Sequence, residues 1–357
     1  MLKYLFSVLL SCVLAISMAS DVQAKNKRND KSKGSTVSVK SKGAVKNKAT
    51  VQKRVKNKLR AKTLKNKAVT SRGKAMKVGY AVRDSKTMGD LAGLGRTYDP
   101  LDLSSNVAFV MDQSTAQVLF EKNSRFPLPI ASITKLMTAM VVLDAKQDMS
   151  EILEVTNRDV DYEKNSPSRL RVGTKLSRAD MLHIALMSSE NRAASALGQN
   201  FPGGIKAFVQ AMNDKARSLG MNDTHYVDST GLSSQNVASA RDLGKLVVAA
   251  YQYPLVRRYS TDTEYVVESK GVLLQYSTSN GLVKNPNWDI GLQKTGYISE
   301  AGRCLVMQTK IDGRPVVMVL LDSKGKHTRL ADAARVRKWL EANEGRTPVE
   351  AAVARQS

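Results

Sequence analysis

Cysteine and histidine are scarce in this sequence, which excludes disulfide-stapled and zinc-centred architectures. The 357 residues include two cysteines, and only Cys304 lies outside the N-terminal hydrophobic segment that contains Cys12. A single cysteine cannot form an intramolecular disulfide, and the strand-like run around Cys304 favours a small buried side chain over a nucleophile. The three histidines, His183, His225 and His327, lack zinc-ligand spacing, so we expect no metal site and no other cofactor. His183 lies in an apolar helical run, which favours packing over a role as a base.

Long hydrophobic runs are also nearly absent, with one exception at the N-terminus. Lys3 precedes an apolar stretch over residues 4 to 18, and the small-residue pattern V-Q-A follows at residues 22–24. Such a run is typical of an export signal and is too short for a membrane span. We therefore predict a cleavable signal peptide at residues 1–24, export to the periplasm and no transmembrane span in the mature chain. A lipid anchor on Cys12 is less favoured, because the apolar run continues beyond that residue.

Acidic residues are almost missing from residues 25–80. This segment holds 20 lysines and arginines against one acid, Asp30, and so carries +19 of the formal net charge of +24. It is rich in polar residues and nearly lacks aromatics, so it cannot bury enough apolar surface to offset the entropy lost on folding. We expect a disordered basic arm over residues 25–80, one folded domain over residues 81–343 and a tail over residues 344–357.

The remaining sequence contains both strand-like and helix-like patterns. Alternating apolar residues predict a β-hairpin over residues 107–120 and strands near 264–268, 291–296, 304–311 and 316–321. Helical spacing predicts helices from Ser132, over 181–187, after Gly203-Gly204, over 240–251 with Pro254 as its stop, and over 328–342. Strands at both ends with helices between them favour an α+β fold, with an antiparallel sheet covered by helices plus a mostly helical lobe.

Three short motifs carry residues suited to catalysis. The first places a serine and a lysine three residues apart at the start of an apolar helix, on one face. A lysine among apolar neighbours loses hydration, which lowers its pKa and lets it take the serine proton. The second motif directly follows a helix, and the third ends a strand. The motifs are Ser132-Ile133-Thr134-Lys135, Ser189-Glu190-Asn191 and Lys294-Thr295-Gly296.

Each motif alone has an ordinary structural alternative. Ser132 could cap a helix while Lys135 extends into solvent, the second motif could be a helix cap, and the third an exposed turn. All three occur here in the order S-x-x-K, S-x-N and K-T-G, each at the expected element boundary. This set is described for serine penicillin-recognising enzymes. Their combination therefore favours a shared site over three coincidences.

From about residue 100 to 343 the sequence resembles the D-alanyl-D-alanine peptidases of family S11, which are low-molecular-weight penicillin-binding proteins. The likeness is greatest to the endopeptidase members, the penicillin-binding protein 7 type. It is carried by PLPIASITKLMTAM, LMSSENRAASALG, DSTGLSSQNV and the run from LQKTG to GRCLVMQT. The resemblance implies a β-lactamase/transpeptidase-like fold, action on peptidoglycan peptides and covalent inhibition by β-lactams.

The resemblance also implies catalytic roles. Ser132 would attack the carbonyl after a D-alanine to give an acyl-enzyme, and Lys135 would take the hydroxyl proton. Ser189 and Asn191 would bridge the two lysines, relay a proton to the leaving amine and hold the substrate amide.

The third motif would bind substrate. Lys294 and Thr295 would hold an anionic group, and Gly296 would let the strand approach the substrate backbone. The backbone N–H groups of Ser132 and Tyr297 would form the oxyanion hole.

Glu190, in the middle of the second motif, favours the endopeptidase interpretation. Endopeptidase members share a glutamate there, whereas many carboxypeptidases of the family carry a small residue. The alternative is a D-alanyl-D-alanine carboxypeptidase that trims stem pentapeptides. A β-lactamase is less favoured, because no glutamate motif of the class A kind follows the second motif.

The basic arm suggests a further possibility from another class, a polyanion-binding protein. The export signal argues against nucleic acid as the ligand. The expected partner is therefore the anionic wall or envelope surface, unless the arm is only a solvated linker that gives the enzyme reach.

Overall fold

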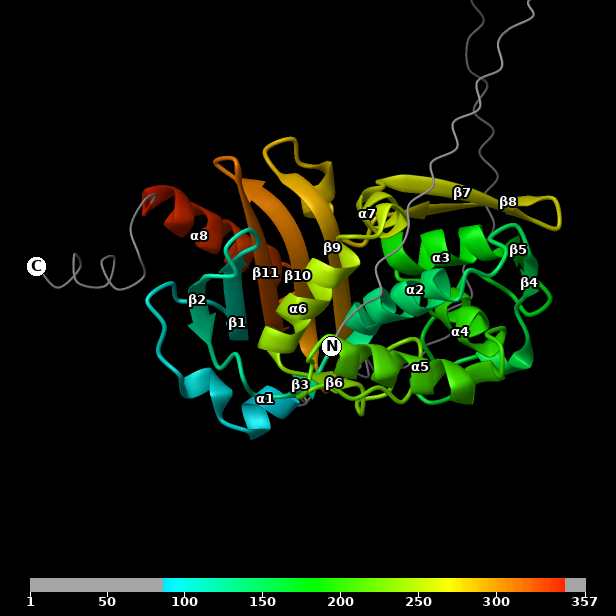
Figure 1. Ribbon diagram of the computed structural model, residues 1–357, viewed down its shortest axis with the longest axis horizontal. Coiled ribbons are helices and arrows are strands. Elements are labelled where there is room, and N and C mark those ends of the chain that lie inside the picture. The colour runs from blue at the N-terminus through cyan, green and yellow to red at the C-terminus, as the bar shows by residue number, and fades with distance from the viewer. Residues whose placement is uncertain (1–85, 344–357) are drawn as a thin grey trace, which may run out of the picture. The chain divides into compact units, whose positions relative to one another are not determined.

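The computed structural model of the chain describes residues 86–343. The predicted signal peptide, basic arm and C-terminal tail lie outside the described residues. Within residues 86–343, an antiparallel sheet carries a helix on each face and is joined to a group of helices, as Figure 1 shows. This arrangement confirms the predicted α+β class.

The sheet has five strands in the order β2-β1-β11-β10-β9, all neighbours antiparallel. The predicted hairpin forms β1 and β2, and the three C-terminal strands follow one another as a meander. β1 lies between β2 and β11, with Ser105 opposite Ser323, so segments from the two ends of the described chain complete one sheet. The strand bounds are β1 Ser105–Asp112, β2 Val118–Lys122, β9 Asp289–Ile298, β10 Gly302–Ile311 and β11 Arg314–Ser323.

Alternation along the strands gives the sheet two apolar faces. On β10, Cys304 and Val306 belong to the core on the side of α6 (Ala240–Ala250), whereas Leu305 and Met307 face the side of α8 (Thr328–Ala342). This is the period-two pattern of a strand buried on both sides. The apolar face of α8, with Ala333 and Val336, packs on the sheet.

The helical lobe is built around α2 (Thr134–Asp144). Every residue from 134 to 142 is buried, because the helix is enclosed by α3, α4, α5, α6 and α7. The other helices of the lobe are α3 Arg178–Met187, α4 Asn191–Gln199, α5 Gly204–Ser218 and α7 Pro254–Thr261. Three small ribbons are β3 Leu128–Pro129 with β6 Val237–Ala238, β4 Ile152–Glu154 with β5 Lys175–Ser177, and β7 Glu264–Ser269 with β8 Val272–Ser277.

Short helical pieces complete the described chain. They are α1 Met88–Leu91 and the 3-10 turns η1 Leu94–Arg96, η2 Ala131–Ile133, η3 Asn157–Asp159 and η4 Gly281–Lys284. None of the helices within residues 86–343 is both long and apolar enough to cross a membrane.

Residues at the ends of the helices explain where the predicted boundaries agree with the structure and where they differ. Ser177 caps α3 by accepting a hydrogen bond from the backbone nitrogen of Asp180, so the helix begins three residues before the predicted Met181. The helix predicted over residues 240–251 is present as α6 and stops before Pro254, but the helix that begins at Pro254 was not predicted. The preceding helix ends at Ala250, and Pro254 is the first residue of α7, where the missing N–H of proline costs no hydrogen bond. The helix α4 and the strand β8 were not predicted.

Candidate active site

Ser132 and Lys135 meet where the chain enters α2. Ser132 lies in η2, and neither η2 nor α2 uses a side-chain cap, so its hydroxyl is not consumed by capping. Nζ of Lys135 donates a hydrogen bond to Oγ of Ser132 at 2.8 Å. Lys135 is 1% exposed, so it does not extend into solvent. The structural alternatives for the first motif therefore do not apply.

Lys135 is held by two further oxygen atoms. Its Nζ lies 2.7 Å from Oδ1 of Asn191 and 2.6 Å from the carbonyl oxygen of Thr230. Burial lowers the pKa of Lys135 to about 7, and the nearby carboxylates of Asp228 and Glu190 limit the fall. A substantial fraction of the lysine is therefore neutral near neutral pH and able to accept a proton.

Lys294 enters the same site from the sheet. It lies on β9, is fully buried, and donates to Oγ of Ser189 and to the carbonyl oxygen of Thr295, both at 2.9 Å. Burial lowers its pKa well below the usual lysine value, and the positive charges of Lys135 and Arg329 add to this effect. In the second motif, Oγ of Ser189 thus contacts Lys294 and Oδ1 of Asn191 contacts Lys135.

β9 approaches η2 closely at Gly296, which leaves little room for a side chain. A Cβ atom at this position would lie 3.0 Å from the carbonyl oxygen of Ile130 and 3.1 Å from the backbone nitrogen of Ser132. Thr295, next to it, donates from Oγ1 to Oγ of Ser279 at 2.7 Å. Tyr297 follows and is 56% exposed. The third motif thus lies against the backbone of the serine.

The loop at residues 228–231, which belongs to none of the three motifs, supplies a backbone acceptor for Lys135. Oδ1 of Asp228 accepts hydrogen bonds from the backbone nitrogens of Thr230 and Gly231, both at 2.6 Å. This tight turn points the Thr230 carbonyl at Lys135. Gly231 has φ +80° and touches the carbonyl of Ala131, where a Cβ atom would lie 1.9 Å away, so only glycine fits.

Arg329 was also missed by sequence reasoning. It lies in the first turn of α8, is 8% exposed, and has no hydrogen-bond partner within residues 86–343 for Nε and Nη1. A buried guanidinium without an acceptor is costly unless an anion reaches it. Its positive charge adds to the lowering of the Lys294 pKa by burial.

Two side chains considered in the sequence analysis are structural. His183 packs between Tyr259 and Tyr265, with ring centroids 4.2 Å and 3.8 Å away, and its Nε2 lies 2.9 Å from Asp262. Cys304 is buried, and burial raises the pKa of its thiol to about 12. Both agree with the predictions made for them. Residues 86–343 contain no cluster of three or more His, Cys, Asp and Glu side chains suited to a metal ion.

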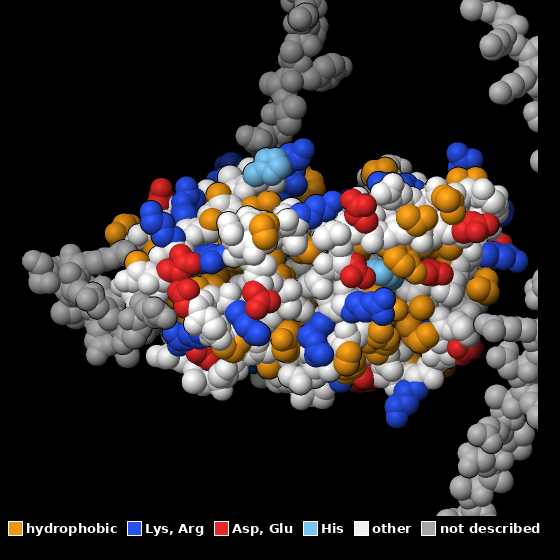
Figure 2. Space-filling model, turned by 90° about the horizontal axis from the view of Figure 1, so that it is seen from above, with side chains coloured by type: hydrophobic (Ala, Val, Ile, Leu, Met, Phe, Trp, Pro, Cys, Tyr) orange, Lys and Arg blue, Asp and Glu red, His pale blue; other side chains and the backbone are white. Residues whose placement is uncertain are grey.

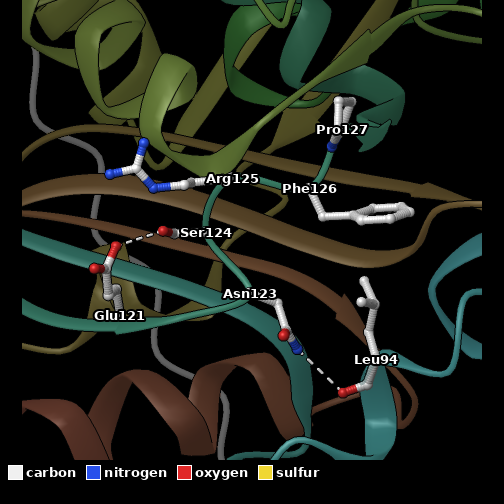
Figure 3. Close-up of a pocket in the computed structure, with 7 residues that line it drawn as sticks. All are labelled: Leu94, Glu121, Asn123, Ser124, Arg125, Phe126 and Pro127. Carbon is white, nitrogen blue, oxygen red and sulfur yellow. Dashed lines mark hydrogen bonds between the residues drawn. The ribbon is translucent and has the colours of Figure 1, made fainter.

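Two hollows in the described part of the chain bear on the location of the site. One, of about 350 Å³, adjoins the second motif and is lined in part by Ser189, Glu190 and Asn191. A more open hollow of about 510 Å³ lies along residues 123–127 and, as Figure 3 shows, is bordered by Leu94 and Phe126. No residue of the three motifs lines the second hollow, so its larger size does not identify the site.

Comparison with known proteins agrees with this geometry. A family model described as D-alanyl-D-alanine carboxypeptidase, peptidase S11, matches residues 95–325. The D-alanyl-D-alanine endopeptidase of Pseudomonas aeruginosa is 51% identical over 245 residues, covering 68% of this chain and 79% of that protein. The D-alanyl-D-alanine endopeptidase of Escherichia coli is 48% identical, covering 67% of this chain and 78% of that protein.

A solved structure shows the same fold. The cefotaxime-bound form of a penicillin-binding protein from Listeria monocytogenes superposes with a TM-score of 0.60 at 28% identity, covering 68% of this chain and 98% of that one. The segment matched by the family model includes all three motifs, which converge in space as described above. On this evidence the chain belongs to the S11 family of D-alanyl-D-alanine peptidases.

Proposed function

We propose that the chain is a serine D,D-endopeptidase that hydrolyses D-alanyl cross-links in peptidoglycan through an acyl-enzyme. The observation that carries the proposal is the 2.8 Å contact between Nζ of Lys135 and Oγ of Ser132, with the pKa of the lysine lowered to about 7. Neutral Lys135 accepts the hydroxyl proton while Oγ attacks the carbonyl carbon of D-alanine. A serine is a weak nucleophile until such a base is in place.

The neighbouring groups complete the step. The negative oxygen of the tetrahedral intermediate accepts hydrogen bonds from the backbone N–H groups of Ser132 and Tyr297. Ser189, whose Oγ accepts from Lys294 at 2.9 Å, relays a proton to the leaving nitrogen as the C–N bond breaks. Water then attacks the ester carbonyl and gives a proton to neutral Lys135, which returns a proton to Oγ of Ser132 as the ester C–O bond breaks. Asn191 holds the amide of the acyl part of the substrate.

The sheet side of the site suits a carboxylate. In a D-alanyl cross-link, as in a terminal D-alanyl-D-alanine, the carbon next to the leaving nitrogen carries a carboxylate. Lys294 and Thr295 would bind this group, and the guanidinium of Arg329, whose Nε and Nη1 have no hydrogen-bond partner within residues 86–343, would supply a further cation. A bound carboxylate would also favour protonation of Lys294, which burial otherwise opposes.

β-Lactams would acylate Ser132 by the same route. They present a strained amide to the nucleophile and a carboxylate to Lys294 and Thr295. The cefotaxime-bound Listeria protein shares the fold and supports this expectation. Hydrolysis of the resulting acyl-enzyme is expected to be slow, so a β-lactam acts as a covalent inhibitor.

The endopeptidase assignment over the carboxypeptidase alternative rests on the names of the two relatives and on Glu190. Digestion of purified muropeptides, with products identified by mass, tests it. An endopeptidase converts cross-linked dimers to monomers, whereas a carboxypeptidase removes one alanine from pentapeptide monomers and leaves dimers intact. The second result would replace the assignment.

We further propose that the chain is exported to the periplasm by residues 1–24 and that residues 25–80 bind the anionic wall or envelope surface. The arm carries +19, whereas residues 86–343 hold 32 basic and 27 acidic residues, and Figure 2 shows both signs interspersed on the face it displays. Contacts made by many exposed charges are screened by salt. Binding of the mature protein to isolated sacculi should therefore fall steeply with salt.

Deletion of residues 25–80 tests the role of the arm. The truncated enzyme should bind sacculi weakly at any salt concentration and should cleave soluble dimers normally, because the three motifs lie beyond it. Equal binding by both forms would leave the arm as a solvated linker.

A further inference from the structure

The hollow beside the second motif is lined by residues that could select a substrate side chain. Its volume is about 350 Å³, and its walls come from the loop with Ser168 and Arg169, the turn at residues 188–191 and the end of β8 at Tyr276. Asn191 belongs both to this wall and to the group around Lys135. The pocket is therefore continuous with the catalytic groups on the side where Asn191 would hold the substrate amide.

Glu190 supplies a negative charge to the pocket. It is 8% exposed, and its Oε1 accepts hydrogen bonds from Oγ of Ser168 at 2.6 Å and from the backbone nitrogen of Arg192 at 3.3 Å. Oε2 has one long hydrogen bond, from the hydroxyl of Tyr276 at 3.4 Å. Glu190 forms no ion pair within residues 86–343. Because a carboxylate oxygen can accept two hydrogen bonds, Oε2 can accept a further one from a ligand.

Arg169 supplies a positive charge at the rim. Its guanidinium lies 5.0 Å from the ring centroid of Tyr276 and donates to the carbonyl oxygen of Gln275, and these two contacts hold it beside the pocket. The side chain is exposed and forms no ion pair with another described residue. One pocket thus offers a carboxylate with spare acceptor capacity and a guanidinium with spare donors.

We propose that this pocket binds the side chain of the residue that precedes the scissile D-alanine and selects a side chain that ends in both an ammonium and a carboxylate group. The carboxylate of the ligand pairs with Arg169 and its ammonium group with Glu190. The inference rests on the proposed function, because that function places the acyl part of the substrate against Asn191. It identifies the substrate class as stems with a diamino dicarboxylic acid before D-alanine.

Penicillins with different acyl side chains test the pocket without relying on cross-link cleavage. An α-aminoadipyl side chain ends in an ammonium and a carboxylate, an adipyl side chain ends in a carboxylate alone, and the phenylacetyl side chain of benzylpenicillin is uncharged. The measurement is the second-order rate constant of acylation for the wild-type protein and for Arg169→Ala, Glu190→Gln and Arg171→Ala. Arg171 is an exposed arginine on the same loop that does not line the pocket, and it serves as the matched control.

The charge pattern predicts a different response for each variant. Arg169→Ala should lower the aminoadipyl-to-benzyl and adipyl-to-benzyl rate ratios about tenfold, the effect of losing one charge-assisted hydrogen bond. Glu190→Gln should lower only the aminoadipyl ratio, because the adipyl side chain has no ammonium group. Arg171→Ala should leave every ratio unchanged.

Two outcomes would overturn the inference in distinguishable ways. If none of the penicillins acylates the wild-type protein, the proposed function fails and the pocket fails with it. If all three acylate at rates that do not depend on side-chain charge, the pocket assignment alone is wrong. The same holds if Arg171→Ala changes the rate ratios as much as Arg169→Ala does. Should Glu190→Gln not fold, Arg169→Ala decides the question.

Discussion

The helical lobe and the sheet each contribute one buried lysine to the site, and the two lysines have different surroundings. Lys135, on α2, contacts three oxygen atoms and has the carboxylates of Asp228 and Glu190 nearby. Lys294, on β9, contacts two oxygen atoms and has the positive charges of Lys135 and Arg329 nearby. Burial lowers both pKa values, so burial alone does not distinguish their roles.

The surroundings separate the two roles. Only Lys135 touches the hydroxyl of Ser132, and its carboxylate neighbours keep its pKa near 7, where a base is most effective. Lys294 lies among cations, and such a cluster attracts an anionic ligand whose arrival neutralises it. We therefore propose that Lys135 of the helical lobe is the base that accepts the serine proton, and that Lys294 of the sheet mainly binds substrate.

Ser132→Ala should have the largest effect, because it removes the nucleophilic oxygen, without which neither the base nor the binding lysine has a reaction to assist. Turnover should fall by ~10⁶, as in other enzymes that lose a serine nucleophile, and labelling by a fluorescent penicillin should disappear. Circular dichroism provides the folding control. Normal labelling of the folded variant would show that Ser132 is not the nucleophile and that the roles assigned to the two lysines are wrong.

Lys135→Ala and Lys294→Ala should differ in kind. Loss of the base should lower the acylation rate roughly 10²–10⁴-fold at any substrate concentration. Loss of the binding lysine should mainly raise KM, by about 10–100-fold, the effect of a lost charged hydrogen bond. Steady-state kinetics on soluble dimers separates kcat from KM, with the exposed Lys175→Ala as control. Effects on KM alone from both variants would show that neither lysine is the base.

Gly296→Ala tests how tightly the two regions must fit. The added methyl group would meet the carbonyl of Ile130 and the backbone nitrogen of Ser132 at 3.0–3.1 Å, so one of these must shift by a few tenths of an ångström. Acylation should slow by about tenfold, since small misplacements at the reacting atoms are costly. Gly281→Ala is the matched control, because nothing lies within 4 Å of its Cβ position. Equal rates for both variants would mean that the fit is loose.

Asp228→Asn should give the smallest effect, visible mainly in pH dependence. Acylation should decline as the pH falls below about 7, because protonated Lys135 cannot accept the serine proton. The Asp228 carboxylate stabilises the protonated lysine, so its removal lowers the lysine pKa and moves this decline to lower pH. Glu190 and Lys294, the other charges facing Lys135, remain in place. The exposed Asp223→Asn should leave the profile unchanged, and an unmoved profile for Asp228→Asn would contradict the assigned influence.

Much of the site could be predicted from sequence, because the functional side chains occur in short motifs at the ends of regular elements. The hairpin of β1 and β2 and the helix α8 also have strong local periodicity, and the predicted bounds of α8 agree with the structure. Local spacing is enough for features of this kind.

The supporting residues could not be predicted in the same way. Thr230 reaches Lys135 through its backbone carbonyl, which carries no side-chain signature, across 95 residues of sequence. Arg329 looks like an ordinary surface arginine until α8 docks on the sheet. The helix α4 begins with a glutamate cap, a residue less typical of that position than serine or aspartate, and its interior is mostly small residues.

The pairing of β1 with β11 has a consequence for the order of folding. Ser105 and Ser323 are direct neighbours in the sheet, so β1 gains this partner only after nearly the whole domain has been synthesised. Pairings this distant in sequence form slowly, because the chain loses the entropy of closing a long loop before the contacts that offset this loss are made. β9 belongs to the same C-terminal meander, so Lys294 reaches Ser189, 105 residues earlier in the chain, only after this late segment has folded. Covalent capture of a fluorescent penicillin needs Ser132 and both lysines in place, so its rate of appearance during refolding would measure docking of this meander on the helical lobe.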